Sequence, residues 1–164
     1  MSLAEGIAQS KRLDAGVFAR IAAQMIDRLG ADDVMAYGGW PKEFIRDFRP
    51  SRNLTIQSFR PQVESSAARA LPADVVVSID YLSHVGMLGV TDALDDLKRV
   101  TVKAGFFYVT IPEFADDLMT AGTVVKPLNW WLQEFAKRFD LHTFQRVPGG
   151  FYVIVYPLVE EVIH

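Results

Sequence analysis

Apolar positions recur at three- and four-residue spacing over residues 17–29, which predicts an amphipathic helix with one buried face. Gly30 follows this pattern as a helix stop. After Asp33, the next apolar run, 34–37, is short and continuous, and it leads directly into Gly38 and Gly39, so the strand is placed over 33–37. This pattern predicts a strand followed by a tight turn.

A second helix is predicted directly after the paired glycines. Pro41 suits the first turn of a helix, because its missing N–H has no partner there in any case. Phe44, Ile45 and Phe48 supply the apolar side of this segment, and Pro50 ends it.

The rest of the chain alternates between strand-like and helix-like patterns. The predicted elements are a strand over 54–59, a loop over 60–72, a strand over 74–79, a helix over 91–100 capped by Thr91, a strand over 105–111, a helix over 127–139, and strands over 141–146 and 151–156. Alternation of this kind predicts an α/β domain spanning 1–164, with a mostly parallel sheet, helices on both faces and a C-terminal antiparallel hairpin.

Composition narrows the classes of function. The net charge is −3, and the basic residues between 42 and 60 are interspersed with acids, so we expect a solvated face and no nucleic-acid partner. The chain contains no cysteine, which excludes thiol catalysis and disulfides. We expect no signal peptide, no membrane span and a cytoplasmic location.

Ligands of open α/β sheets bind outside the carboxyl ends of the strands. Gly38 and Gly39 lie at such an end, where they either let a ligand approach the backbone or simply form a tight turn. Asp80 follows the strand over 74–79, either as a ligand acceptor or as a cap of the next turn. His84 is either a general base or a structural residue, and no metal site is expected.

One stretch carries a family resemblance. Residues 73–85 read Ala-Asp-Val-Val-Val-Ser-Ile-Asp-Tyr-Leu-Ser-His-Val. They resemble the fourth-strand motif of class I S-adenosylmethionine-dependent methyltransferases, commonly Asp-Val-Val-x-x-x-Asp-Val-Leu-Glu-His-Val. Residues 94–100 and 103–107 are similar to the following helix and strand of that family. The resemblance covers about 31–157, and its C-terminal end is similar to that of small bacterial and phage-type members.

The resemblance implies a three-layer, Rossmann-like fold and S-adenosylmethionine as cofactor. It also implies a set of cofactor-binding positions: Tyr37, Gly38, Gly39, Ser58, Asp80 and Tyr81. Asp80 and His84 are the candidates for catalytic residues beside the substrate.

The chain departs from the family where the cofactor would bind. In the first motif, acid-x-Gly-x-Gly-x-Gly, the acid is replaced by Ala36, the second glycine by Trp40 and the third by Lys42. The acid that closes the second strand would fall near Ser58, and the usual glutamate before His84 is replaced by serine. The segment 60–72 is too short for a crossover helix and a third strand, so we expect a shortened sheet.

Two functions are compatible with these patterns. The first is a non-catalytic binding or scaffold module with an eroded cofactor site, which acts with an unknown small molecule or protein partner or as a homodimer. The alternative is an active methyltransferase on an unknown small-molecule or protein substrate. Trp40 and Trp130 are candidate contact residues of the scaffold, although core or rim packing also explains Trp130. A nicotinamide oxidoreductase is disfavoured because the G-x-G-x-x-G fingerprint is absent.

Overall fold

The computed structural model describes residues 14–61, 69–111, 124 and 126–159. The helices and strands of this part are, in order, α2 (Gly16–Leu29), β1 (Asp33–Tyr37), α3 (Lys42–Asp47), β2 (Thr55–Phe59), β3 (Ala73–Ile79), the 3-10 helix η1 (Leu82–His84), α4 (Met87–Val100), β4 (Thr101–Thr110), α6 (Leu128–Ala136), β5 (Phe139–Val147) and β6 (Gly150–Pro157).

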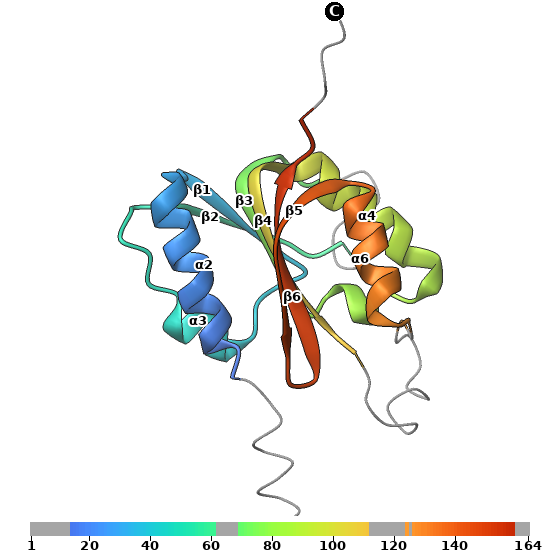
Figure 1. The fold of residues 1–164 in the computed structure, drawn as a ribbon. Coiled ribbons are helices and arrows are strands. Elements are labelled where there is room, and N and C mark those ends of the chain that lie inside the picture. The colour runs from blue at the N-terminus through green and yellow to red at the C-terminus, as the bar shows by residue number, and fades with distance from the viewer. Residues whose placement is uncertain (1–13, 62–68, 112–123, 125, 160–164) are drawn as a thin grey trace, which may run out of the picture.

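These elements form three layers around one six-stranded sheet (Figure 1). The strand order is β2-β1-β3-β4-β6-β5. The strands β2, β1, β3 and β4 are parallel, whereas β6 runs antiparallel to both β4 and β5. Helices α2 and α3 cover one face, and α4 and α6 cover the other (Figure 1). The prediction of a mostly parallel sheet with an antiparallel C-terminal hairpin is confirmed.

The sheet ends at β2 on one side. Among the described residues β2 pairs with β1 alone, and only residues 62–68 of the segment that links it to β3 lie outside the described part. Within the described residues the sheet is therefore shortened, as the sequence predicts, with no strand beyond β2. Most of the loop predicted over 60–72 lies outside the described residues.

Several boundaries differ from the sequence prediction. Helix α4 begins at Met87, one turn before the predicted cap Thr91, because Gly86 takes a φ of 80° and directs the chain into the helix. Helix α6 ends at Ala136, so Phe139 is buried as the first residue of β5 instead of the last residue of a helix. Ile45, expected on the apolar side of its helix, is 58% exposed, since α3 spans only six residues.

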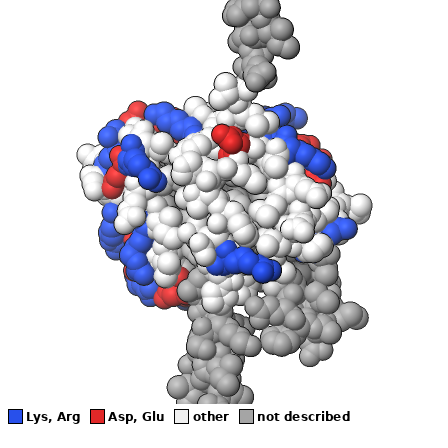
Figure 2. Space-filling model, viewed as in Figure 1, with Lys and Arg blue, Asp and Glu red and all other residues white. Residues whose placement is uncertain are grey.

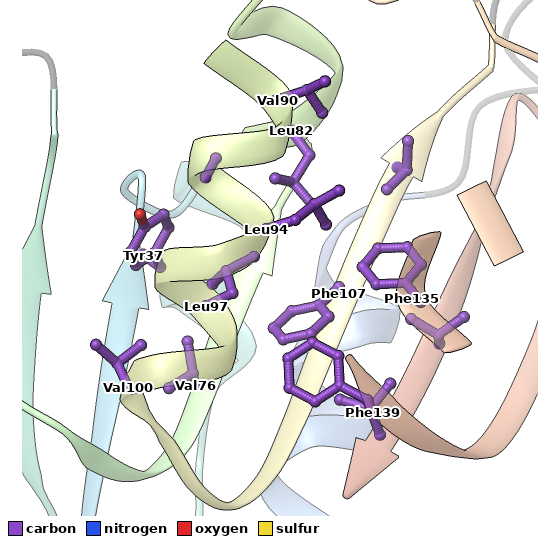
Figure 3. Packing of buried hydrophobic residues seen from close by; sticks show 14 of the residues in the cluster. Tyr37, Val76, Leu82, Val90, Leu94, Leu97, Val100, Phe107, Phe135 and Phe139 are labelled. Atoms are coloured by element: carbon purple, nitrogen blue, oxygen red, sulfur yellow. The ribbon is translucent and has the colours of Figure 1, made fainter. Parts of the chain in front are cut away.

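Two apolar cores flank the sheet. The core under α2 and α3 contains Phe18, Ile26 and Phe44 against the side chains of β1, β3 and β4. The core under α4 and α6 is drawn in Figure 3, where leucines of α4 face aromatic rings from β4, α6 and β5. Trp131 is fully buried in this second core. Each such side chain contributes about 1.5–3 kcal/mol on burial, so the sheet and its strand ends are held firmly.

Candidate functional site

The strand order reverses between β1 and β3. Helix α3, which follows β1, covers one face of the sheet, and α4, which follows β3, covers the opposite face (Figure 1). The ladder between the two strands ends at the pair Ala36 and Val77, so the chains diverge beyond it. In α/β folds this crevice is where a ligand binds.

The indole of Trp40 lies at this crevice. Its Nε1 donates a hydrogen bond to the carbonyl oxygen of Val77 at 3.1 Å, at the last rung of the ladder. The ring packs on Phe44 and Phe48, with centroid distances of 4.6 and 5.1 Å. The indole is therefore anchored at both its polar edge and its apolar face.

Two further side chains cover the paired glycines. Gly38 and Gly39 have φ angles of 86° and 85°, which residues other than glycine rarely adopt. A β-carbon on Gly38 would collide with the Tyr81 ring, and one on Gly39 would lie 3.0 Å from the Arg60 guanidinium. The space beside both glycines is thus occupied by this chain's own side chains.

Asp80 lies at the end of β3 with a φ of 65°, a left-handed conformation that aspartate tolerates better than most residues. Its Oδ1 accepts hydrogen bonds from the Ser83 hydroxyl at 2.5 Å and from the Thr110 backbone N–H at 3.1 Å. Its Oδ2 lies 3.2 Å from Nε2 of His84. The carboxylate joins the ends of two strands to η1, which is a structural role of the capping kind.

His84 is exposed, and its imidazole has this carboxylate as its polar partner among the residues that the structure describes. Ser83 and His84 meet the same aspartate from two sides, so the three do not form a relay from hydroxyl to imidazole. Ser58 pairs with Ala36 in the sheet and is exposed, and β2 ends one residue later. The resemblance calls for an acid near Ser58, and neither this serine nor the following Phe59 and Arg60 supplies one.

Tyr37 is buried against α4. Its hydroxyl donates to Oδ2 of Asp96 at 2.6 Å. Burial, and then this hydrogen bond, raise the pKa of Tyr37 well above its ordinary value, and burial also raises the pKa of Tyr81. Both phenols therefore stay protonated at neutral pH. The structure brings Tyr37, Gly38 and Tyr81 together, and it brings Asp80 and His84 together.

A pocket of about 500 Å³ opens on the α4 side of the sheet, and the sequence patterns did not predict it. The side chains and backbone of β1, β2 and α4 supply most of its lining, which is Tyr37, Phe59, Pro61, Arg69, Tyr81, Gly89, Asp92, Ala93, Asp95, Asp96 and Arg99. The one available signal was the group of aspartates in the helix, which is typical of an ordinary solvated face. Only the fold brings this helix to the aromatic rings of β1 and β2.

Charged side chains elsewhere are mostly paired. Arg46 contacts Asp14 at 3.1 Å and Asp47 at 2.9 Å, and Arg20 contacts Asp47 at 3.1 Å. Figure 2 shows Lys and Arg interspersed with Asp and Glu along the edge of the molecule, around a broad face with few charges. This side of the chain shows no continuous basic stripe. None of the described helices is both long and apolar enough to cross a membrane.

Comparisons with known proteins show the fold. No protein-family model and no curated protein matches the chain. Solved structures do match. An O-methyltransferase family protein from Burkholderia thailandensis has a TM-score of 0.61 at 12% identity, over 90% of this chain and 58% of its own. Magnesium protoporphyrin IX methyltransferase from Synechocystis PCC 6803, with bound SAH, has a TM-score of 0.57 at 8% identity, over 91% and 85%.

A third match, PigF with SAH, has a TM-score of 0.61 at 11% identity and covers 93% of this chain and 64% of its own. The chain thus spans little more than half the length of several matched structures. It has the Rossmann-like fold of S-adenosylmethionine-dependent methyltransferases, with a six-stranded sheet.

Proposed function

We propose that this chain is a non-catalytic binding module built on the methyltransferase fold. The observation that carries the proposal is the hydrogen bond from Trp40 Nε1 to the Val77 carbonyl, at the crevice where strand order reverses. A side chain anchored in this way takes up the space of a ligand at the fold's usual binding point.

The neighbouring residues do not fit S-adenosylmethionine. The cofactor carries two ribose hydroxyls and a charged amino-acid end, and its binding requires hydrogen-bonding partners. Ala36 and Ser58 stand where the resemblance calls for acids. The Tyr81 ring lies against Gly38, and the Arg60 guanidinium lies against Gly39. Asp80 already accepts two hydrogen bonds within the protein. No methyl-transfer step is therefore derived.

A non-catalytic binding module acts through a partner. We propose that this partner is a small molecule, another protein, or a second copy of this chain in a homodimer. The module offers two features for this role: a rigid sheet with cores on both faces, and the open pocket beside α4. Sedimentation velocity at about 5–100 µM, a range that brackets micromolar affinities, tests self-association directly.

Calorimetry with S-adenosylhomocysteine tests the proposal. The purified chain is titrated to millimolar ligand, and a structural neighbour that was crystallised with SAH serves as positive control. We expect no heat of binding and no thermal shift with this chain. A dissociation constant in the micromolar range, about −8 kcal/mol of binding free energy, would overturn the proposal and favour the active methyltransferase.

A further inference from the structure

The pocket beside α4 is separate from the crevice at which Trp40 lies. It lies over the ends of β1 and β2 on the opposite face of the sheet from α3, next to the sheet edge where no further strand follows β2 in the described part of the chain. Its volume of about 500 Å³ falls within the range of small-molecule sites, which is about 300–1,000 Å³. Tyr81 links the two places, because its ring covers Gly38 and also lines the pocket.

Aromatic rings form one wall. The Tyr37 ring centroid lies 5.8 Å from that of Phe59 and 5.5 Å from that of Tyr81, with the two tyrosine rings nearly perpendicular. Figure 3 shows Tyr37 beside α4, the helix that supplies the opposite wall. That wall has small residues at Gly89 and Ala93, and a β-carbon on Gly89 would meet nothing closer than 3.8 Å. Tyr37 is fully buried and bonded to Asp96 of this helix, so its ring closes the floor of the pocket. The partly buried rings of Phe59 and Tyr81 leave an apolar surface against which a flat group can lie.

Most charges around the pocket are already neutralised. Asp96 accepts from the Tyr37 hydroxyl on one oxygen and from the Arg99 guanidinium on the other, at 2.6 Å in both cases. Asp95 pairs with Arg138 at 2.7 Å. Both oxygens of Asp96 are thus in use, and the charge of Asp95 is balanced by Arg138.

Two opposite charges remain. Asp92 and Arg69 both line the pocket, and neither has a hydrogen bond or ion pair with any residue in the described ranges. Asp92 is held on α4, one helical turn before Asp96, so it shares that helix face. One free carboxylate and one free guanidinium at the rim of an aromatic pocket match a ligand that carries both an ammonium and a carboxylate group.

We propose that this pocket binds a small zwitterion with a flat apolar body, the chemistry of an aromatic amino acid. The rings of Phe59 and Tyr81 take the flat body above the buried Tyr37, Asp92 accepts from the ammonium, and Arg69 donates to the carboxylate. This inference rests on the binding module proposed above and names its ligand class. It concerns a different surface from the cofactor crevice, so SAH and amino-acid titrations can fail independently.

The test uses three indoles that differ only in charge. L-Tryptophan is the zwitterion, tryptamine lacks the carboxylate, and indole-3-propionate lacks the ammonium. Each is titrated into the ¹⁵N-labelled chain and followed by backbone amide shifts. We expect L-tryptophan to bind at least about tenfold more tightly than either analogue, since each lost charge-assisted hydrogen bond weakens binding by about that factor. The shifts should map to Gly89, Ala93 and the adjoining turn of α4.

Three variants assign the contacts. In Asp92→Asn, the affinity for L-tryptophan and for tryptamine should fall about tenfold, while the affinity for indole-3-propionate should not fall. In Arg69→Gln, the affinity for L-tryptophan and for indole-3-propionate should fall, while the affinity for tryptamine should not fall. Gly89→Phe fills the pocket at a helical position with room for a β-carbon, and it should abolish binding of all three probes. Unchanged thermal stability of the variants establishes that they fold.

The outcomes that overturn the proposal are distinct. Tryptamine binding as tightly as L-tryptophan would make the pocket a cation site, and indole-3-propionate doing so would make it an anion site. Shifts that map away from α4, persist in Gly89→Phe, or fail to appear for any probe would reject this pocket as the zwitterion site. None of these outcomes depends on whether SAH binds to the crevice.

Discussion

Replacing Trp40 separates the two ways in which its indole is held. Trp40→Ala removes the ring that packs on Phe44 and Phe48 together with the donor to the Val77 carbonyl. Aromatic truncations in cores cost about 3–5 kcal/mol, and because this side chain is only partly buried we expect the lower end, about 3 kcal/mol. Trp40→Phe keeps most of the packing and loses only the N–H, so we expect about 1–2 kcal/mol from the unpaired carbonyl.

Urea unfolding followed by circular dichroism measures both values, because tryptophan fluorescence changes with the substitution itself. Trp130→Phe is the matched control: Trp130 is also partly buried, but its indole N–H makes no hydrogen bond within the described residues, so we expect less than about 1 kcal/mol. A loss below about 1 kcal/mol for Trp40→Ala would mean that the indole lies in solvent. A Phe variant as stable as the wild type would mean that the bond to Val77 contributes nothing.

Three further contacts, at the strand ends and in the helices, each predict a difference in stability that can be measured on variants. Asp80→Ala should lower the free energy of unfolding by about 1–2 kcal/mol, because it leaves the Thr110 backbone N–H unpaired, whereas the Ser83 hydroxyl keeps its bond to the residue-80 carbonyl. His84→Ala, at an exposed pair, should cost less than about 1 kcal/mol, and equal losses would refute the capping role. Gly38→Ala should be destabilised by at least about 1 kcal/mol more than Gly86→Ala. Both glycines have a positive φ, but only a β-carbon at Gly38 meets an aromatic ring, that of Tyr81. Equal melting temperatures of the two variants would show that no ring lies against Gly38. Glu134 accepts hydrogen bonds from neighbouring cations, which hold its pKa below 4.5. Glu134→Gln should therefore lower the free energy of unfolding by its whole amount above pH 4.5, and this loss should disappear as the pH falls through the lowered pKa. A stability difference between wild type and variant that persists in acid would contradict this.

The elements best predicted from the sequence are those with local boundary signals. The strand Asp33–Tyr37 lies between a helix-stopping glycine and a glycine turn, and the structure has it at the predicted residues. The predicted start of α4 was wrong because Leu88, almost completely exposed at 99%, breaks the apolar pattern of its first turn. The spacing of apolar residues gives no information on this first turn of α4, because its position depends on the conformation of the preceding Gly86.

The site depends on contacts between distant residues. The sequence marks Trp40 as an unusual residue after the glycines, but not that its N–H reaches a carbonyl 37 residues away. The contact between Tyr37 and Asp96 joins residues 59 apart, so the pocket wall exists only once β1 and α4 are packed together. The fold could therefore be predicted from the sequence, whereas the pocket beside α4 could not.

The indole N–H resonance of Trp40 tests the central claim most directly. The chain has three tryptophans, and the Trp40→Phe variant assigns this resonance by its absence. We predict slow exchange of the Trp40 indole N–H with solvent, because it is bonded to the Val77 carbonyl, and no shift of its resonance on addition of millimolar S-adenosylhomocysteine. Rapid exchange, or a saturable shift at micromolar ligand, would show that the crevice is open and contradict the proposed closure by Trp40.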